Sequence, residues 1–265
     1  FYLTSNLIEE ENYKNWHKNQ HYEKKINVIT FTMMEMFCRH DRPDTYSTID
    51  ETVESIRNQA DTFKNFLCLN RIKRPMRLAA IYEIFNSDLL SNTLISYDKI
   101  TYDDIIRNFR RFGYSYDFIN QNKDKIEKFM NSSPAVLDCQ DFKINWAGTD
   151  YPKDLYRSSL ISIVNETLYS SYNNTSIFYS EKTFKPMASN HPVFIIGQPN
   201  LNTSFSKIGY KNYNAYFDLS FDTIEDHKER LAAQIYQLEE LNGKLNSMTV
   251  DEKIKWLLQD VDTLN

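Results

Sequence analysis

Residues 160–197 read LISIVNETLYSSYNNTSIFYSEKTFKPMASNHPVFIIG, and this stretch indicates most clearly how the chain folds. The apolar run at 160–164 predicts a buried strand, and the run VFII at 193–196 predicts a second one. Between them, a polar loop leads into a helix that opens around Ser180 and Glu181. A strand, a helix and another strand in this order are typical of a parallel sheet covered by helices. The stretch therefore predicts an α/β protein.

The same alternation continues on both sides of this stretch. Three more short apolar runs are predicted strands: 26–31, 66–69 and 93–97. Amphipathic patterns predict helices at 50–62, 75–87, 101–111, 122–130, 224–245 and 250–264. The long helix lacks the sustained charge pairing of a coiled coil, which favours packing on its own domain. The last helix is expected to pack back on the domain as well.

A boundary between two lobes is expected near residue 63. Residues 1–62 contain one good strand and a polar loop at 39–48, which indicates a smaller and incomplete N-terminal lobe. Residues 63–265 suffice for a nucleotide-binding α/β unit with terminal helices. Because the chain begins at Phe1 rather than Met, residues upstream are expected to contribute to the first lobe.

The composition and the spacing of a few residue types argue against several classes of function. With 31 Lys and Arg against 36 Asp and Glu, the net charge of −5 argues against general capture of nucleic acid, although a local basic face stays open. The five glycines form neither a dinucleotide-binding fingerprint nor a P-loop. No apolar run is long enough to predict a membrane span. The widely spaced Cys38, Cys68 and Cys139 predict reduced thiols in the cytoplasm rather than a zinc site.

A basic segment follows the predicted strand 66–69. The strand ends at Asn70, and four basic residues crowd the loop and the first helical turn: Arg71, Lys73, Arg74 and Arg77. Open α/β sheets bind ligands at such junctions, and Arg side chains beside free helical N–H groups suit a phosphate or diphosphate. A solvated basic turn is the alternative interpretation.

The second group of candidates lies in the stretch quoted first. Asn165 and Glu166 follow its first strand, and Glu181 and Lys182 open its helix. A carboxylate at a helix start is oriented by the helix dipole and can accept hydrogen bonds from two vicinal hydroxyls, such as those of ribose. The adjacent lysine can reach a phosphate. Alternatively, Ser180 and Glu181 only cap the helix and the lysine is solvated.

Together these motifs resemble the nucleotide-binding half of the α1,3-fucosyltransferases and their relatives. The order strand, N-E-T, loop, aromatic-x-Ser-Glu-Lys, helix, H-P-V, strand, Gly is similar to that family's E-N-S, Y-[IV]-T-E-K and V-P-V pattern. Upstream, Asn70, Arg74 and Arg77 stand where the family has a strand ending in S-N and an A-R-x-R-type stretch. The pattern also resembles phage- and giant-virus-encoded glycosyltransferases, including enzymes that decorate hydroxymethylated DNA bases. The resemblance covers roughly residues 63–245.

The resemblance implies a two-lobed glycosyltransferase of the B architecture. Its C-terminal lobe would hold the sugar nucleotide, and its N-terminal lobe would bind most of the acceptor. Carried over by position, Glu181 would hold the ribose hydroxyls, Lys182 a phosphate and Arg77 the diphosphate. Phe178 would line the base or ribose pocket. The complete set of implied nucleotide-sugar contacts is Asn70, Arg74, Arg77, Asn165, Glu166, Phe178, Ser180, Glu181 and Lys182.

Two further expectations concern the reaction. Glycosyltransferases of the A architecture hold a divalent metal with a D-x-D after a strand, whereas the D-x-D here, 260–262, lies in the expected helical tail. We therefore expect no obligatory metal and no cofactor besides the donor substrate. An inverting enzyme also needs a general base. The candidates follow the strand 26–31: Glu35 and Asp41 are preferred, His40 and Asp44 lie beside them, and a base upstream stays open.

Three functions follow from these patterns. The leading hypothesis is a cytoplasmic glycosyltransferase that transfers a sugar from a nucleotide-sugar donor to a hydroxyl, either on a modified base in viral DNA or on a glycan. A second hypothesis is a non-catalytic module that binds a sugar nucleotide or glycan. A third is a nucleic-acid-binding protein in which segments 71–77 and 107–111 meet phosphates and the 18 Tyr and 17 Phe stack on bases. The acidic net charge counts against this third hypothesis.

Overall fold

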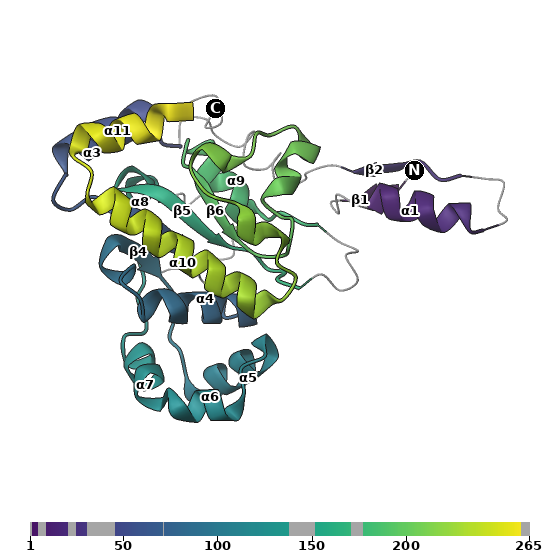
Figure 1. Cartoon of the computed structure of the whole chain (residues 1–265), viewed down its shortest axis with the longest axis horizontal. Helices are drawn as coiled ribbons and strands as arrows, with labels where there is room; N and C mark the ends of the chain where they lie inside the picture. Colours follow the sequence, from purple (N-terminus) through teal and green to yellow (C-terminus); the bar gives the residue numbers. More distant parts are fainter. Residues whose placement is uncertain are drawn as a thin grey trace.

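The computed structural model describes residues 2–4, 9–20, 25–30, 46–70, 72–137, 152–170 and 177–260. In these residues the chain forms a four-stranded parallel sheet and a separate two-stranded parallel sheet (Figure 1). Helices flank the larger sheet, so the predicted α/β class is confirmed, and the arrangement is compatible with a Rossmann-like fold. Each of the five predicted strands has a counterpart in the structure.

The strands of the larger sheet are ordered so that the chain adds strands first on one side of β3 and then on the other. Its strands are β3 (Lys64–Leu69), β4 (Thr93–Ser96), β5 (Ser159–Asn165) and β6 (Val193–Ile196). They lie in the order β4-β3-β5-β6 and are all parallel. The chain therefore adds β4 on one side of β3 and then crosses to add β5 on the other side. Open α/β sheets bind ligands where the order reverses in this way. We call the carboxyl ends of β3 and β5 the switch point.

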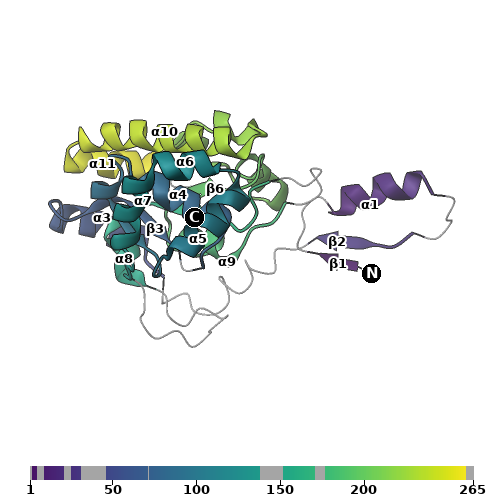
Figure 2. The ribbon, with the colours of Figure 1, turned by 90° about the horizontal axis from the view of Figure 1, so that it is seen from below.

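Helices cover both faces of this sheet. The helix α4 (Pro75–Phe85) joins β3 to β4, and α9 (Glu181–Ala188) joins β5 to β6. Right-handed connections running in opposite directions place these two helices on opposite faces. Figures 1 and 2 show α4 beside the long α10 (His227–Asn246), with α9 across the sheet from them. The amino ends of α4 and α9 both follow strand ends at the switch point.

The remaining helices surround this framework. They are α3 (Ile49–Asn58), α5 (Tyr102–Phe112), α6 (Tyr116–Gln121), α7 (Lys123–Asn131), α8 (Lys153–Arg157) and α11 (Val250–Leu257). Short 3-10 helices span Leu90–Asn92, Thr203–Ile208, Tyr213–Ala215, Ser220–Thr223 and Leu258–Asp260. The predicted helix 224–245 starts only at His227, because Asp226 caps it by accepting the backbone N–H groups of Lys228 and Glu229. No sequence pattern predicted α6, which Ser115 caps.

Aromatic side chains build much of the core. Fully buried rings lie on both faces of the sheet: Phe66, Phe109, Phe112, Phe129, Phe194, Phe205 and Phe221. Tyr179 stacks on Phe205 with ring centroids 4.8 Å apart. Burial of such rings contributes strongly to stability. The high aromatic content therefore serves packing here, which weakens the hypothesis that these rings stack on nucleic-acid bases.

The N-terminal residues form a small unit of their own. The strands β1 (Tyr2–Thr4) and β2 (Val28–Thr30) pair in parallel, and α1 (Glu9–Lys18) connects them. Figure 1 shows this unit apart from the larger sheet. The helix α3 precedes residue 63 yet packs against α8 and α11. The lobe boundary near residue 63 stays a prediction. In the part of the chain that the structure describes, no helix is long and apolar enough to cross a membrane.

Candidate functional site

The structure brings the two groups of predicted site residues together at the switch point. The side-chain amide of Asn165, at the end of β5, donates a hydrogen bond to Oδ1 of Asn70, which follows β3, at 3.1 Å. Nε of Arg77 donates to the backbone carbonyl of Asn165 at 3.1 Å, and its Nη2 donates to Oγ1 of Thr167 at 3.0 Å. The side chains of Asn70, Arg77 and Asn165 are buried. They thus form the floor of one site.

Arg77 occupies an unusual place for a cation. It lies in the first turn of α4, which Pro75 opens at a position where proline is favoured, and only 1% of its surface is exposed. Burial and the nearby charge of Arg74 lower the pKa of Arg77, while the carboxylates of Glu166 and Glu181 oppose that shift. The guanidinium therefore holds the end of β5 in place. Its predicted contact with a diphosphate stays a prediction.

Glu166 is a buried residue whose hydrogen bonds link the end of β5 to the start of α9. Its Oε1 accepts hydrogen bonds from the backbone N–H of Ser180 at 2.8 Å, from the Ser180 hydroxyl at 2.9 Å and from the Thr183 hydroxyl at 2.6 Å. Its Oε2 accepts the backbone N–H of Thr167 at 3.2 Å. With 1% of its surface exposed, the side chain is enclosed by these partners. It positions the start of α9.

The start of α9 carries two charged side chains that solvent can reach. The Ser180 hydroxyl caps the helix by accepting the backbone N–H of Lys182. Glu181 and Lys182 form an ion pair, with 34% and 29% of their side chains exposed. Burial raises the pKa of Glu181, but Lys182, a backbone hydrogen bond and Lys185 outweigh it, so the pKa lies below its usual value. Glu181 is therefore an ionised acceptor at the rim of the site.

Three further positions complete the surroundings. Arg74, the residue before α4, and Phe178, two residues before Ser180, are each partly exposed. Gly197 follows β6 and leaves room for Glu166. A Cβ at position 197 would lie 3.3 Å from Cβ of Glu166 and 2.7 Å from Leu201. A larger residue would displace Leu201 or the segment that follows β5, which carries Glu166 and Leu168.

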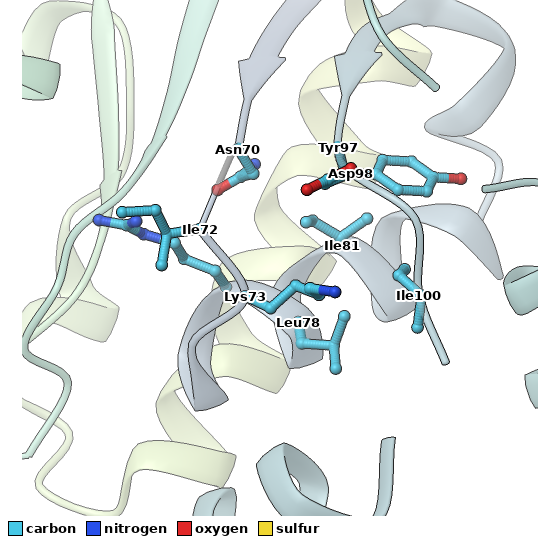
Figure 3. A pocket seen from close by; sticks show the side chains of 9 residues that line it. Asn70, Ile72, Lys73, Leu78, Ile81, Tyr97, Asp98 and Ile100 are labelled. Carbon is cyan, nitrogen blue, oxygen red and sulfur yellow. The ribbon is translucent and has the colours of Figure 1, made fainter. Parts of the chain in front are cut away.

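A small pocket adjoins Asn70 and Arg77 on the β4 side (Figure 3). Its walls come from the ends of β3 and β4 and from the first turns of α4. Lys73 lines it, and the Lys73 ammonium donates to the Asp104 carboxylate and to the backbone carbonyl of Lys99, both at 2.8 Å. Asp98 lines it from the end of β4.

Several other candidates play different roles or lie elsewhere. The proposed bases Glu35, His40, Asp41 and Asp44 lie outside the described residues, as do Arg71, Cys38 and Cys139. Two cations of the basic segments, Lys73 and Arg107, both pair with Asp104. A third, Arg110, lies over the ring of Tyr116. These contacts leave fewer cations to meet a nucleic acid.

Cys68 lies directly beneath the site. Burial raises the pKa of its thiol to about 12, although the amides of Asn70 and Asn165 donate to its sulfur and lower the pKa in part. A thiol with such a pKa is a poor nucleophile. Cys68 is therefore part of the packing under the switch point.

Sequence reasoning missed three residues at this site. Thr167 and Thr183 hold Arg77 and Glu166 in place. Two signals could have found them: Thr167 is the threonine of N-E-T, and Thr183 is the third residue of the helix that Ser180 caps. The third residue is Asp98, whose position directly after the predicted strand 93–97 was a usable signal as well.

Neither a search for metal-binding clusters among the described residues nor comparison with known proteins assigns a function to this site. In the described ranges, no three or more His, Cys, Asp or Glu side chains gather as a possible metal site. Asp260, the first residue of the D-x-D, ends a short 3-10 helix, and the other two residues lie outside the described part. No protein-family model, no curated protein and no solved structure matches this chain. Its class is thus that of an α/β protein with a parallel sheet and a polar site at the switch point.

Proposed function

We propose that this chain is a glycosyltransferase that binds a nucleotide-sugar donor at the switch point. One observation carries the proposal: Asn70, which follows β3, and Arg77, in the first turn of α4, both contact Asn165 at the end of β5. Asn165 donates its side-chain amide to Asn70, and Arg77 donates to the backbone carbonyl of Asn165. Two groups expected from separate motifs thus share one place, where open α/β sheets hold nucleotides. The resemblance to α1,3-fucosyltransferases supports the same function.

Positive charge lies where a diphosphate would be expected. Arg74 at the start of α4 and Lys182 at the start of α9 are both partly exposed. Each helix also presents the positive end of its dipole at this side of the sheet. Sugar transfer leaves a nucleoside diphosphate with new negative charge, so cations fixed in advance lower the barrier. Arg77 contributes by holding β5, and its charge adds to the same field.

The carboxylate of Glu181 suits hydroxyl groups of the donor. An ionised carboxylate only accepts hydrogen bonds, and its two oxygens fit two vicinal hydroxyls. Glu166 and Ser180 fix the backbone from which Glu181 extends. We assign Glu181 and Lys182 as donor contacts and Glu166 as a positioning residue.

The rest of the reaction follows as part of the proposal. Inversion at the sugar needs a base for the acceptor hydroxyl, and Glu35 and Asp41 in the N-terminal part are the candidates. A two-lobed B architecture, with the acceptor on the N-terminal lobe, suits this division. The cations make an obligatory metal unnecessary. The acceptor is a hydroxyl of a modified DNA base or of a glycan, and without a base the same site would serve a binding module.

The proposal is tested by ligand binding. The native protein is titrated with uridine, guanosine, adenosine and cytidine diphosphates and their sugar conjugates, and its Tm is followed, since a specific ligand raises the Tm by mass action. Lys182→Ala and Glu181→Gln should each weaken binding about ten-fold to a hundred-fold, because each removes a charge-assisted contact. Lys207→Ala, which changes an exposed lysine away from the switch point, should bind as the native protein does.

The outcomes separate the functions. Hydrolysis of a bound sugar conjugate, or its transfer to an acceptor, supports an enzyme over a binding module. If none of the four nucleotides changes the Tm, or if Lys182→Ala and Glu181→Gln bind like Lys207→Ala, the proposed donor site is wrong.

A further inference from the structure

Arg230, in the first turn of α10, is a second fully buried cation. In the described part of the chain, its hydrogen bonds all go to backbone carbonyls. Nε donates to Gly197 at 3.1 Å, Nη1 donates to Ile224 and to Glu225, and Nη2 donates to Tyr169. Because a buried charge must be compensated by hydrogen bonds, the guanidinium and these four carbonyls fix one another's positions.

The four carbonyls belong to three separate segments of the chain. One follows β6 directly, one lies four residues beyond the end of β5, and two lie in the turn before α10. One turn further along α10, the side-chain amide of Gln234 donates to the carbonyl of Ile195 in β6 at 3.1 Å. The helix α10 thus supplies side-chain donors to β6, the last strand of the sheet, and joins it to the segment that follows β5.

The end of β6 packs directly on the residues that follow β5. A Cβ at Gly197 would lie 3.3 Å from Cβ of Glu166 and 3.4 Å from the carbonyl oxygen of Leu168. Glu166 in turn fixes the start of α9 through its hydrogen bonds. A continuous chain of contacts therefore runs from Arg230 through the end of β6 to the helix start that carries Lys182.

The two buried arginines hold the segment after β5 at its two ends. Arg77 donates to the carbonyl of Asn165, where this segment begins, and Arg230 donates to the carbonyl of Tyr169, four residues later. Hydrogen bonds from a charged donor are stronger than those between neutral groups, so both ends are fixed before a ligand arrives. A site fixed in advance loses less conformational freedom when it binds its ligand.

We propose that Arg230 is a positioning residue of the donor site. Through the carbonyls of Tyr169 and Gly197 it fixes the place of Glu166, and thereby the place of Lys182 at the start of α9. The inference rests on the proposed function, because the start of α9 is expected to hold the donor. Arg230 itself does not touch the donor, since it is fully buried and bonded within the protein.

Nucleotide affinity separates positioning from stability. The nucleoside diphosphate that stabilises the native protein most is titrated by calorimetry, at a temperature where circular dichroism shows each variant to be folded. Arg230→Lys keeps the charge but loses the planar array of donors, so it should lower the Tm and also weaken binding about ten-fold.

Asn65→Ala is the matched control for a loss of stability alone. Asn65 is buried at the start of β3, at the amino end of the sheet, and its amide donates to Asn242 and Asn246 of the same helix α10. Its replacement should lower the Tm and leave the affinity for the nucleotide unchanged.

A double-mutant comparison asks whether Arg230 acts through the start of α9. In a protein that already carries Lys182→Ala, adding Arg230→Lys should weaken binding by about three-fold or less, because the contact that Arg230 positions is gone. Where Arg230→Lys shows no cooperative unfolding, Arg230→Gln is measured in the same way, since it places amide donors there without a charge.

Each result decides the matter. If Arg230→Lys binds the nucleotide as the native protein does, or if Asn65→Ala weakens binding equally, Arg230 does not position the donor site, although the proposed function still holds. A ten-fold effect of Arg230→Lys that persists in Lys182→Ala overturns the inference in the same way. If no nucleoside diphosphate binds the native protein, both the inference and the proposed function are wrong.

Discussion

Replacing Glu166 by Gln should destabilise the protein and weaken donor binding, although Glu166 itself is buried. The carboxylate accepts hydrogen bonds from Ser180, Thr183 and Thr167, and the four donor-acceptor distances lie between 2.6 and 3.2 Å. An amide of the same shape can keep its oxygen toward Ser180 and Thr183. Its NH2 group then faces the backbone N–H of Thr167, so a donor meets a donor.

The size of the effect follows from these bonds. A hydrogen bond to a charged group contributes about 1.5–3 kcal/mol and a neutral one about 0.5–1.5 kcal/mol. Three weakened bonds and one lost bond, offset by the easier burial of a neutral amide, give a destabilisation of about 3 kcal/mol. For a chain of this size, that corresponds to a fall in Tm of about 6–12 °C.

Thermal unfolding and nucleotide titration measure both effects. Glu54→Gln is the matched control, because Glu54 is an exposed glutamate of α3. Glu166→Gln should lower the Tm and also weaken binding of the nucleoside diphosphate, since Glu166 fixes the backbone of Glu181 and Lys182. If the Tm and the affinity of Glu166→Gln both match those of Glu54→Gln, Glu166 does not position α9.

Three other predictions concern pH, metal and salt. His191 is fully buried between the hydroxyl of Ser162 and the backbone carbonyl of Tyr156, and burial lowers its pKa to about 4. The unfolded chain binds a proton near pH 6.5, so stability should be complete above that pH and fall by up to about 3 kcal/mol as the pH drops toward 4; urea unfolding of His191→Gln should lack this part of the pH dependence. Donor binding and sugar transfer should survive EDTA, and a loss that manganese or magnesium restores would contradict a metal-independent site. If the acceptor is DNA with a hydroxymethylated base, its binding should fall steeply with added salt, whereas binding of a glycan acceptor should change little; transfer to an oligosaccharide but not to this DNA at equal low salt would exclude the DNA acceptor.

The sequence predicted the elements because their signals are local. Strands such as β5 and β6 are short apolar runs, and the sequence of such a run is enough to indicate that the segment is buried. Helix starts are similarly local, since Thr101 and Thr249 form capping boxes with acidic residues three positions later. The start of β3 was not found, because Lys64 and Asn65 are polar. Asn65 is buried because its side-chain amide donates to Asn242 and Asn246 of α10 and its oxygen accepts a hydrogen bond from Lys253 of α11.

The candidate site was predicted as a list of residues, not as an arrangement. Asn70, Arg77, Asn165 and Glu166 were each found from strand ends and charge. The order of the strands decides which of them meet, and strand order depends on long-range pairing that no local pattern encodes. Only the tertiary structure therefore showed that β3 and β5 are neighbours.

The tertiary structure also decided what each charged side chain does. In the sequence, Glu166 and Glu181 look alike, as carboxylates near the ends of a strand and a loop. Folding surrounds Glu166 with three donor residues and leaves Glu181 partly exposed beside Lys182. A buried carboxylate must satisfy its hydrogen bonds within the protein, whereas an exposed one can exchange water for a ligand. The sequence alone determined which residues carry charge, and burial determined which of them can meet a substrate.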